Sequence, residues 1–164
     1  MAAGKYIDVV SGILTQKNSV DASAGAGDAG KLVSLNASGM IDTTMLDGTY
    51  TANVGTGPVA AGDLVYITAA GLVEPAIATA AASLADGYCI TGATSGNPVT
   101  VHLSGENTAV AGLTVGSEYY LDASTAGAIT ATPPAGATQF QQPVGFAVTA
   151  TQLHFRPQRP SQNP

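Results

Sequence analysis

Histidine is the residue type best suited to metal binding or proton transfer in this sequence, and the chain has two, His102 and His154. Each lies between two apolar residues, in Val-His-Leu and in Leu-His-Phe. Because alternate side chains of a strand face opposite sides of a sheet, both imidazoles should point away from the core that their neighbours fill. A metal site needs further ligands, and the sequence offers none with ligand spacing. We therefore expect histidines that are exposed or lie at an interface, and no metal site.

A glycine-rich run at residues 25–30 (GAGDAG) matches the dinucleotide-binding pattern G-x-G-x-x-G. That function requires an apolar strand before the run and a helix after it. Here the polar residues 17–21 precede the run, a strand-like segment follows it, and Asp28 would place a negative charge beside a pyrophosphate. We interpret the run as a flexible hinge and expect no cofactor.

The remaining polar residues form no recognisable catalytic constellation. Serine, histidine and aspartate are present, but the G-x-S-x-G elbow of a hydrolytic triad is not. Carboxylates for glycoside hydrolysis are available, yet nothing singles out a pair, and no Trp is present to stack on a sugar. We therefore expect no catalytic residues and no enzymatic activity.

Positive charge is confined to the two ends of the chain. The five cations are Lys5, Lys17, Lys31, Arg156 and Arg159, and residues 32–155 contain Asp and Glu but no Lys or Arg. Phosphate binding requires clustered Lys and Arg, and anionic membrane surfaces attract the same residues. We therefore expect no nucleic acid and no membrane as partners. The terminal cations are the only ones available to an acidic partner, and a solvated C-terminal tail without a binding role is the open alternative.

The composition indicates a weakly charged surface. Charged residues make up 10% of the 164 residues, against roughly 25% in an ordinary soluble domain. High charge normally keeps a free monomer soluble, so this composition suits a protein that faces other subunits. A secreted or extracytoplasmic β domain would share the composition and is an open alternative at this point.

The sequence shows no targeting signal, and its single cysteine gives no indication of function. No segment is apolar over the length that a membrane-spanning helix needs, and the N-terminus lacks the basic and apolar regions of a signal peptide. We expect synthesis in a cytoplasm. The single cysteine, Cys89, lies in an apolar run and is expected to be a buried small hydrophobe.

Short apolar runs separated by frequent turn residues predict an all-β fold, a small barrel or sandwich. Residues 1–50 are expected to form an N-terminal arm and hairpin, 51–156 a β-rich body, and 157–164 an extended proline-rich tail that cannot continue a sheet. The strands of the body are expected near 63–68, 71–74, 86–91, 98–103, 118–122, 128–131, 143–149 and 151–155.

Three segments are harder to interpret. In the arm, residues 5–10 and 31–35 are strand candidates, and residues 15–30 are expected to be extended. A turn at 36–39 leads to a short element at 40–46. The alanine-rich residues 76–85 fit either a short helix or a closely packed loop.

The body contains an internal repeat, with residues 61–104 matching residues 115–156. The paired segments are 62–67 with 116–121, 71–73 with 127–129, 87–91 with 145–149, and 101–103 with 153–155. A repeat of this length predicts two β-halves that close on a shared core.

Several phrases resemble virion proteins of tailed phages. The phrase GDAGKLVSLNASGMID at 27–42 resembles one common near the start of such proteins. The phrases AGDLVY at 61–66, DGY at 86–88 and VTVHLSG at 99–105 resemble phage capsid cement or decoration proteins, and GLTVGSEYYL at 112–121 with PVGFA at 143–147 is similar to head and tail-fibre proteins. The resemblance implies a β-rich trimer or dimer that sits on the major capsid protein and staples neighbouring subunits together.

We therefore expect a structural virion protein that decorates and stabilises the outer surface of a phage capsid by binding major capsid subunits. The arm would add a strand to an exposed sheet edge of a neighbouring subunit, a main-chain mode of binding that does not depend on charge. The expected contact residues are Lys5, Tyr6, Ile7, Val9 and Val10.

Two other functions remain open from the sequence. One is a phage head or tail fibre or baseplate component that binds a host receptor or glycan. It would need an exposed aromatic cluster, for which Tyr88, Tyr119 and Tyr120 are the candidates. The other is an adhesion module on the outside of a bacterium.

Overall fold

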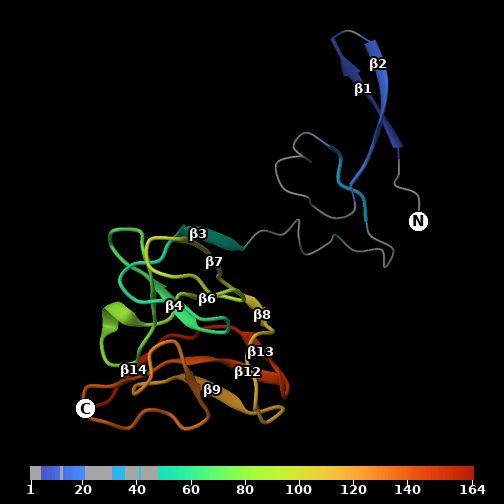
Figure 1. Ribbon diagram of the computed structural model, residues 1–164. Coiled ribbons are helices and arrows are strands. Elements are labelled where there is room, and N and C mark those ends of the chain that lie inside the picture. Colours follow the sequence, from blue (N-terminus) through green and yellow to red (C-terminus); the bar gives the residue numbers. More distant parts are fainter. Residues whose placement is uncertain (1–4, 12, 21–30, 36–40, 42–47) are drawn as a thin grey trace. The chain divides into compact units, whose positions relative to one another are not determined.

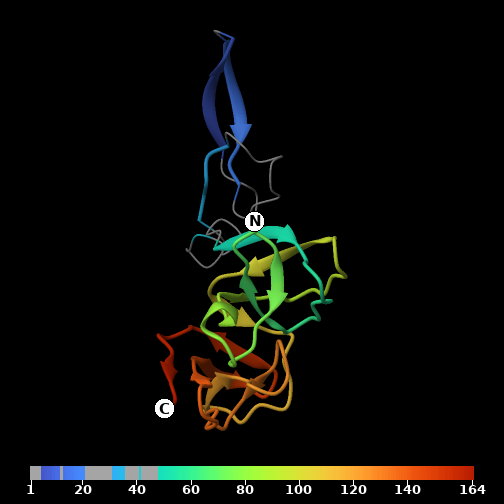
Figure 2. The same cartoon turned by 90° about the vertical axis from the view of Figure 1, so that its left-hand side faces the viewer.

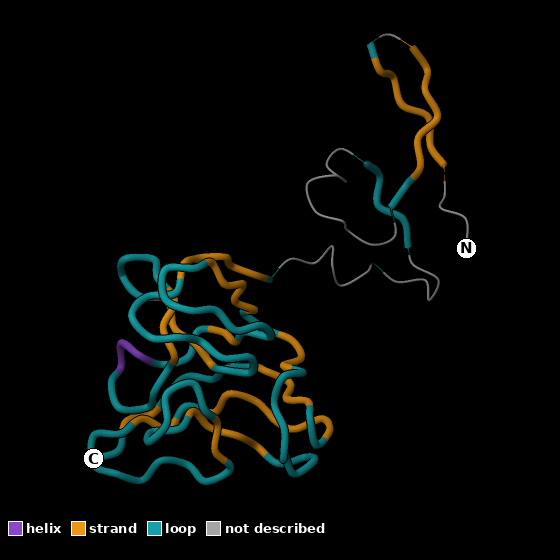
Figure 3. Tube along the Cα trace, in the orientation of Figure 1, coloured by secondary structure: helices purple, strands orange, loops and turns teal. Residues whose placement is uncertain are grey.

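The computed structural model describes residues 5–11, 13–20, 31–35, 41 and 48–164 (Figure 1). The chain divides into two compact units, Met1–Asp47 and Gly48–Pro164. The predicted all-β class is confirmed. The described residues form strands and loops, with a single short turn of 3-10 helix at Ala81–Ser83 (Figure 3). The alanine-rich segment is therefore a loop, not an α-helix.

The first unit is built on a hairpin. Strand β1 (Lys5–Val10) pairs antiparallel with β2 (Ile13–Asn18), and Ser11 has the positive φ of 53° that tight hairpin turns require. Strand β2 was not predicted, because it alternates poorly and is mostly polar. The predicted strand at 31–35 reduces to one bridge between Val20 and Val33. The glycine-rich run, the turn at 36–39 and most of 40–46 lie outside the described residues.

The body begins with a five-stranded antiparallel sheet in the order β3-β7-β6-β4-β5. Its strands are β3 (Thr49–Asn53), β4 (Leu64–Ile67), β5 (Val73–Pro75), β6 (Gly87–Tyr88) and β7 (Pro98–His102). The sheet curls until Val54 and Val73 meet at a single bridge, without closing into a barrel. Its concave face holds a core made of Val54, Val59, Val65, Val73, Cys89, Val99 and Val101.

The second half of the body forms another five-stranded antiparallel sheet, in the order β10-β9-β12-β13-β8. Its strands are β8 (Gly105–Asn107), β9 (Glu118–Leu121), β10 (Ile129–Thr130), β12 (Pro143–Thr149) and β13 (Gln152–Phe155). One face carries Tyr119, Leu121, Val144, Ala147, Leu153 and Phe155, all buried in a second core.

The segments matched in the sequence repeat occupy corresponding places in the two sheets. Strands β7, β6, β4 and β5 follow one another in the first sheet in the same order as β13, β12, β9 and β10 in the second. The fifth places are taken by β3 and β8, which lie outside the matched segments. The two halves therefore share one topology.

A single core joins the two halves in a sandwich-like arrangement (Figures 1 and 2). Leu64 and Tyr88 leave the first sheet on the face opposite its own core and enter the second core, where the Tyr88 ring meets Phe155 edge-on at 5.3 Å. Residues 76–85 pass beside the second sheet: the Gly127 amide donates to the Ala76 carbonyl (2.7 Å). Small alanine side chains permit this close passage.

The C-terminal tail corrects one prediction. Residues 157–164 were expected to be unable to continue a sheet, but β14 (Ser161–Gln162) pairs with β11 (Phe140–Gln141). Asn163 also donates from Nδ2 to the Pro134 carbonyl (2.8 Å). Proline removes only its own N–H, so the residues between two prolines can still pair.

Two glycines at matching positions of the repeat allow close contact between strands, and their replacement should destabilise the body. A Cβ on Gly87 would meet the His102 carbonyl oxygen at 2.6 Å, and a Cβ on Gly145 would overlap the His154 carbonyl oxygen. Gly145 also has a φ of +148°. We expect Gly87→Ala to lower the free energy of unfolding by about 2 kcal/mol and Gly145→Ala by about 3 kcal/mol, measured by urea denaturation.

Gly96→Ala provides the matched control. Gly96 has a φ of +81° but open space around it. Only the unfavourable backbone conformation should therefore lower the free energy of unfolding of this variant, by about 1 kcal/mol. Equal losses in all three variants would show that the close approach does not matter.

Burial without a cation raises the pKa of Asp63, although the 2.8 Å hydrogen bond from the Ala60 amide opposes the shift. A carboxyl pKa raised in the folded state stabilises the fold at acid pH, and this contribution disappears as the pH rises through the folded pKa. Asp63→Asn keeps an oxygen acceptor and removes the charge. We expect it to raise the melting temperature at pH 7 and to lose this advantage near pH 3.

Asp86→Asn is the control for loss of one negative charge. Asp86 also accepts a backbone hydrogen bond, from the Ile67 amide (2.9 Å), but it is exposed. Equal shifts of the melting temperature with pH in the two variants would contradict the assignment of the effect to the half-buried Asp63 carboxyl.

Candidate functional site

The predicted arm contacts lie on β1. Lys5 and Ile7 are exposed, and Tyr6 is half-buried. The Tyr6 hydroxyl is shielded from solvent and finds no hydrogen-bond partner in the described part of the chain. Of Val9 and Val10 the structure describes the backbone, which pairs with Leu14 and Ile13. The strand predicted to bind a partner is thus already paired along one edge, and strand addition would use the edge that faces away from the other strand of the hairpin.

The hairpin leaves several of its apolar side chains exposed to solvent. Ile7 is 69% exposed and Leu14 is 74% exposed, and the strand register places both on the same face of the hairpin. Ile13, on the other face, is exposed as well. The charged groups on that other face are partly satisfied, since Lys17 donates to the Asp8 carboxylate at 2.8 Å and this contact raises the Lys17 pKa.

The rest of the first unit adds exposed apolar residues instead of a core. Leu32, Val33, Leu35 and Ile41 are all largely exposed. Among the described residues of this unit, only Ser19 is buried. A two-stranded hairpin is marginally stable by itself. The described residues of the first unit thus leave most of their apolar side chains exposed.

A second exposed apolar surface lies on the body. We call it the outer face, meaning the side of the second sheet that points away from the shared core. The register places Glu106, His154, Phe146 and Glu118 directly opposite one another in a row across β8, β13, β12 and β9. Phe146 is 46% exposed, and Val148, two residues further along β12, is similarly exposed. The outer face thus has an apolar centre with carboxylates on both sides.

The two histidines occupy equivalent places in the repeat but different surroundings. His154 lies on the outer face as expected, with Nδ1 at 2.6 Å from the Glu106 carboxylate and its ring tilted against Phe146. His102 also points away from the core that its neighbour Val101 fills, as expected. That side of the first sheet is covered, and the His102 ring stacks on the buried Tyr88 with ring centroids 5.2 Å apart. The face of the first sheet that carries His102 is the one that joins the two halves.

The aromatic cluster considered for receptor binding does not form. Tyr88 is 2% exposed, and Tyr119 is also buried, with its hydroxyl accepting a hydrogen bond from the Thr114 amide (2.9 Å). Tyr120 alone reaches the surface, where its hydroxyl donates to Glu118 (2.6 Å), and this hydrogen bond raises the Tyr120 pKa. Phe146, which the sequence reasoning did not single out, is the aromatic residue most open on this sheet.

Cys89 is fully buried in the first core, as predicted, and burial raises its thiol pKa to about 11. Such a thiol is protonated at neutral pH and is a poor nucleophile. Within the described residues, no three His, Cys, Asp or Glu side chains gather closely enough to hold a metal ion. The described part of the chain also has no helix of the length and apolarity needed to cross a membrane.

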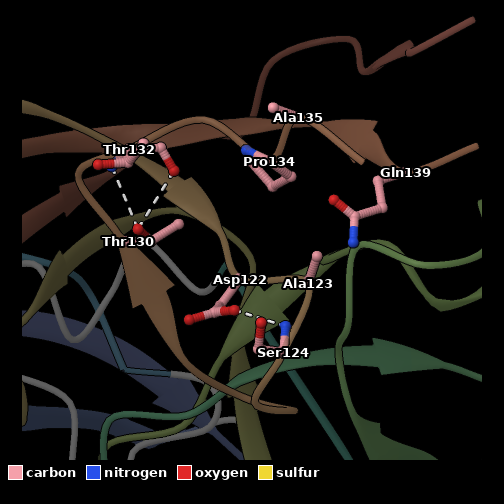
Figure 4. Close-up of a pocket in the computed structure, with 8 residues that line it drawn as sticks. All are labelled: Asp122, Ala123, Ser124, Thr130, Thr132, Pro134, Ala135 and Gln139. Carbon is pink, nitrogen blue, oxygen red and sulfur yellow. Dashed lines mark hydrogen bonds between the residues drawn. The ribbon is translucent and has the colours of Figure 1, made fainter. Parts of the chain in front are cut away.

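A shallow hollow of about 290 Å³ lies between the loops that flank β10 (Figure 4). Its lining is mostly polar and is formed by Asp122, Ala123, Ser124, Thr130, Thr132, Pro134, Ala135 and Gln139. The polar groups bond mainly to one another: the Asp122 carboxylate accepts from the Ser124 amide (2.6 Å), and the Thr130 hydroxyl bonds to the Thr132 backbone. The hollow thus consists of turn-stabilising contacts and has no pair of carboxylates.

Comparison with known proteins identifies no relative. No family model matches the chain, and no curated protein matches its sequence. The two exposed apolar surfaces, on the hairpin and on the outer face of the body, are therefore the basis for assigning a function.

Proposed function

We propose that this protein is a structural component of a phage particle that decorates the outside of the capsid and attaches to major capsid subunits through its N-terminal arm. The observation that carries the proposal is the exposure of Ile7 and Leu14 on one face of the hairpin. Exposed apolar patches of this kind mark interaction sites.

The body favours a structural role. Its two cores are filled by its own side chains, so it does not depend on the arm for its hydrophobic core. Residues 32–155 contain no Lys or Arg, which argues against attachment through nucleic acid. A body with a complete core and a sparsely charged surface suits a subunit that is displayed on a shell.

The arm favours a main-chain mode of attachment. Both strands of the hairpin have one edge whose N–H and C=O groups do not pair with the other strand, and such edges pair readily with an exposed strand of another protein. The apolar side chains on the face with Ile7 and Leu14 would then be buried against the capsid subunit. Each attachment is weak alone, and an oligomer with several arms gains avidity.

The test is binding of purified protein to capsids that lack it, with occupancy measured by cryo-electron microscopy and by gel densitometry. Deletion of residues 1–20 and the double variant Ile7→Asp/Leu14→Asp should abolish binding, because the contact surface is removed or charged. Val115→Asp is the control, since Val115 is exposed to a similar degree but lies in the body.

Full occupancy by the deletion variant would overturn the proposal. Copy number separates decoration from the fibre alternative, because decoration places many copies over the shell and a tail component is present in a few. Absence of the protein from purified particles would contradict both assignments.

A further inference from the structure

The outer face of the second sheet has a buried counterpart in the same molecule. Phe146 and His154 correspond in the repeat to Tyr88 and His102, and in both sheets the aromatic residue lies opposite the histidine in the register. Tyr88 is almost completely covered by the second half of the body, whereas its counterpart Phe146 is open. This position of the fold is therefore suited to packing against another sheet, and in the second half it has no cover among the described residues.

The polar groups beside Phe146 are arranged so that the face complements itself, with a carboxylate acceptor on one side and an imidazole on the other. Glu118 and His154 lie directly opposite Phe146 on the two neighbouring strands, β9 and β13. Strands in a sheet are about 4.8 Å apart, so the carboxylate and the imidazole lie at similar distances on either side of the aromatic ring. Consider a two-fold axis that runs parallel to β12, above Phe146 and between two sheets that face each other. It places Glu118 of one copy opposite His154 of the other.

We propose that the outer face is an interface between two copies of this chain, related by a two-fold axis along β12. Phe146 and Val148 of the copies would pack against each other, and Glu118 of each copy would face His154 of the other. Sheets that pack face to face are about 10 Å apart, which glutamate and histidine side chains can span together. Two-fold interfaces use the same patch on both subunits, so one row of residues supplies both halves of the contact.

The hydrogen bonds already present orient Glu118 and His154 for this contact. The Glu106 carboxylate holds His154 through Nδ1 at 2.6 Å, which leaves Nε2 for the second copy. The Tyr120 hydroxyl holds Glu118 through Oε2 at 2.6 Å, which leaves Oε1. Both side chains are thus oriented within one copy, and orienting a group before binding lowers the entropic cost of association.

Other occupants of this face fit less well. A nucleic acid would be repelled by Glu106 and Glu118. The concave face of the first sheet in another copy is unavailable, because its own valines and Cys89 fill it. The inference does not depend on what the arm binds.

The experiment measures the mass of the full chain in the absence of capsids, by analytical ultracentrifugation over a dilution series. We expect a dimer, and we expect Phe146→Glu to raise its dissociation constant by more than about tenfold because a charge would be buried without a partner. Leu72→Glu, on an exposed residue in the turn between β4 and β5 of the first sheet, should leave the dimer unchanged. Thermal melting followed by circular dichroism checks that each variant is folded.

A charge exchange gives the sharper test. Glu118→Lys alone and His154→Glu alone should each weaken self-association, because the first variant places a lysine against His154 and the second places a glutamate against Glu118. An equimolar mixture of the two variants should form a heterodimer in which the introduced lysine faces the introduced glutamate. A folded monomer for the unaltered chain, an undiminished dimer in Phe146→Glu, or no heterodimer in the mixture would each overturn the proposal.

Failure here is distinguishable from failure of the capsid assignment. The dimer is measured with protein alone and altered at β9, β12 and β13, whereas attachment is measured on shells and altered in the arm. A dimer that is lost when residues 1–20 are deleted but persists in Phe146→Glu would place self-association in the arm and would contradict this proposal.

Discussion

Tyr88 crosses from the first sheet into the second core, and its ring meets Phe155 edge-on at 5.3 Å. Sheets of five very short strands bury little surface each, and they become stable by sharing a core. The Tyr88 contact makes that sharing possible, because it gives the first sheet two buried faces, one on its own valine core and one on the second half. Gly87 allows the adjacent backbone to approach the His102 carbonyl closely, which keeps Tyr88 in place.

The two halves share a topology but use equivalent positions differently. At the position where the first sheet has the fully buried Leu64, the second sheet has Glu118, and where the first has buried Tyr88, the second has exposed Phe146. The terminal unit of a stacked array needs a more polar outer surface than the units inside it. Glu118 in place of Leu64 follows that rule. Phe146 in place of Tyr88 does not, because it keeps an aromatic residue on the outer surface. This mixture of polar and apolar groups suits a reversible interface.

The arm and the body are stabilised by different means. The body has two apolar cores and strands with many partners, whereas the hairpin of the arm has cross-strand hydrogen bonds, one ion pair between Lys17 and Asp8, and exposed aliphatic side chains. A self-sufficient body joined to such a segment can fold before assembly and attach afterwards.

The sequence by itself determined the all-β class and most strands of the body, because those strands alternate apolar and polar residues between turn residues. It also related β4, β5, β6 and β7 to β9, β10, β12 and β13. It did not reveal β2, β3, β8, β11 or β14. The last three have only two or three residues each, as in GEN and SQ, and β2 and β3 are mostly polar. Their pairing depends on a distant strand that offers a free edge, and no local pattern records that neighbour.

The tertiary structure decided which face of each strand is covered. Alternation shows that Tyr88 and His102, or Phe146 and His154, share a side of a sheet, but it does not show what lies on that side. Tyr88 and Tyr119 were candidates for a surface cluster and are buried, while Phe146, in a similar local sequence, is open. The physical reason is that burial is a property of two packed surfaces, and the second surface comes from residues far away in the chain.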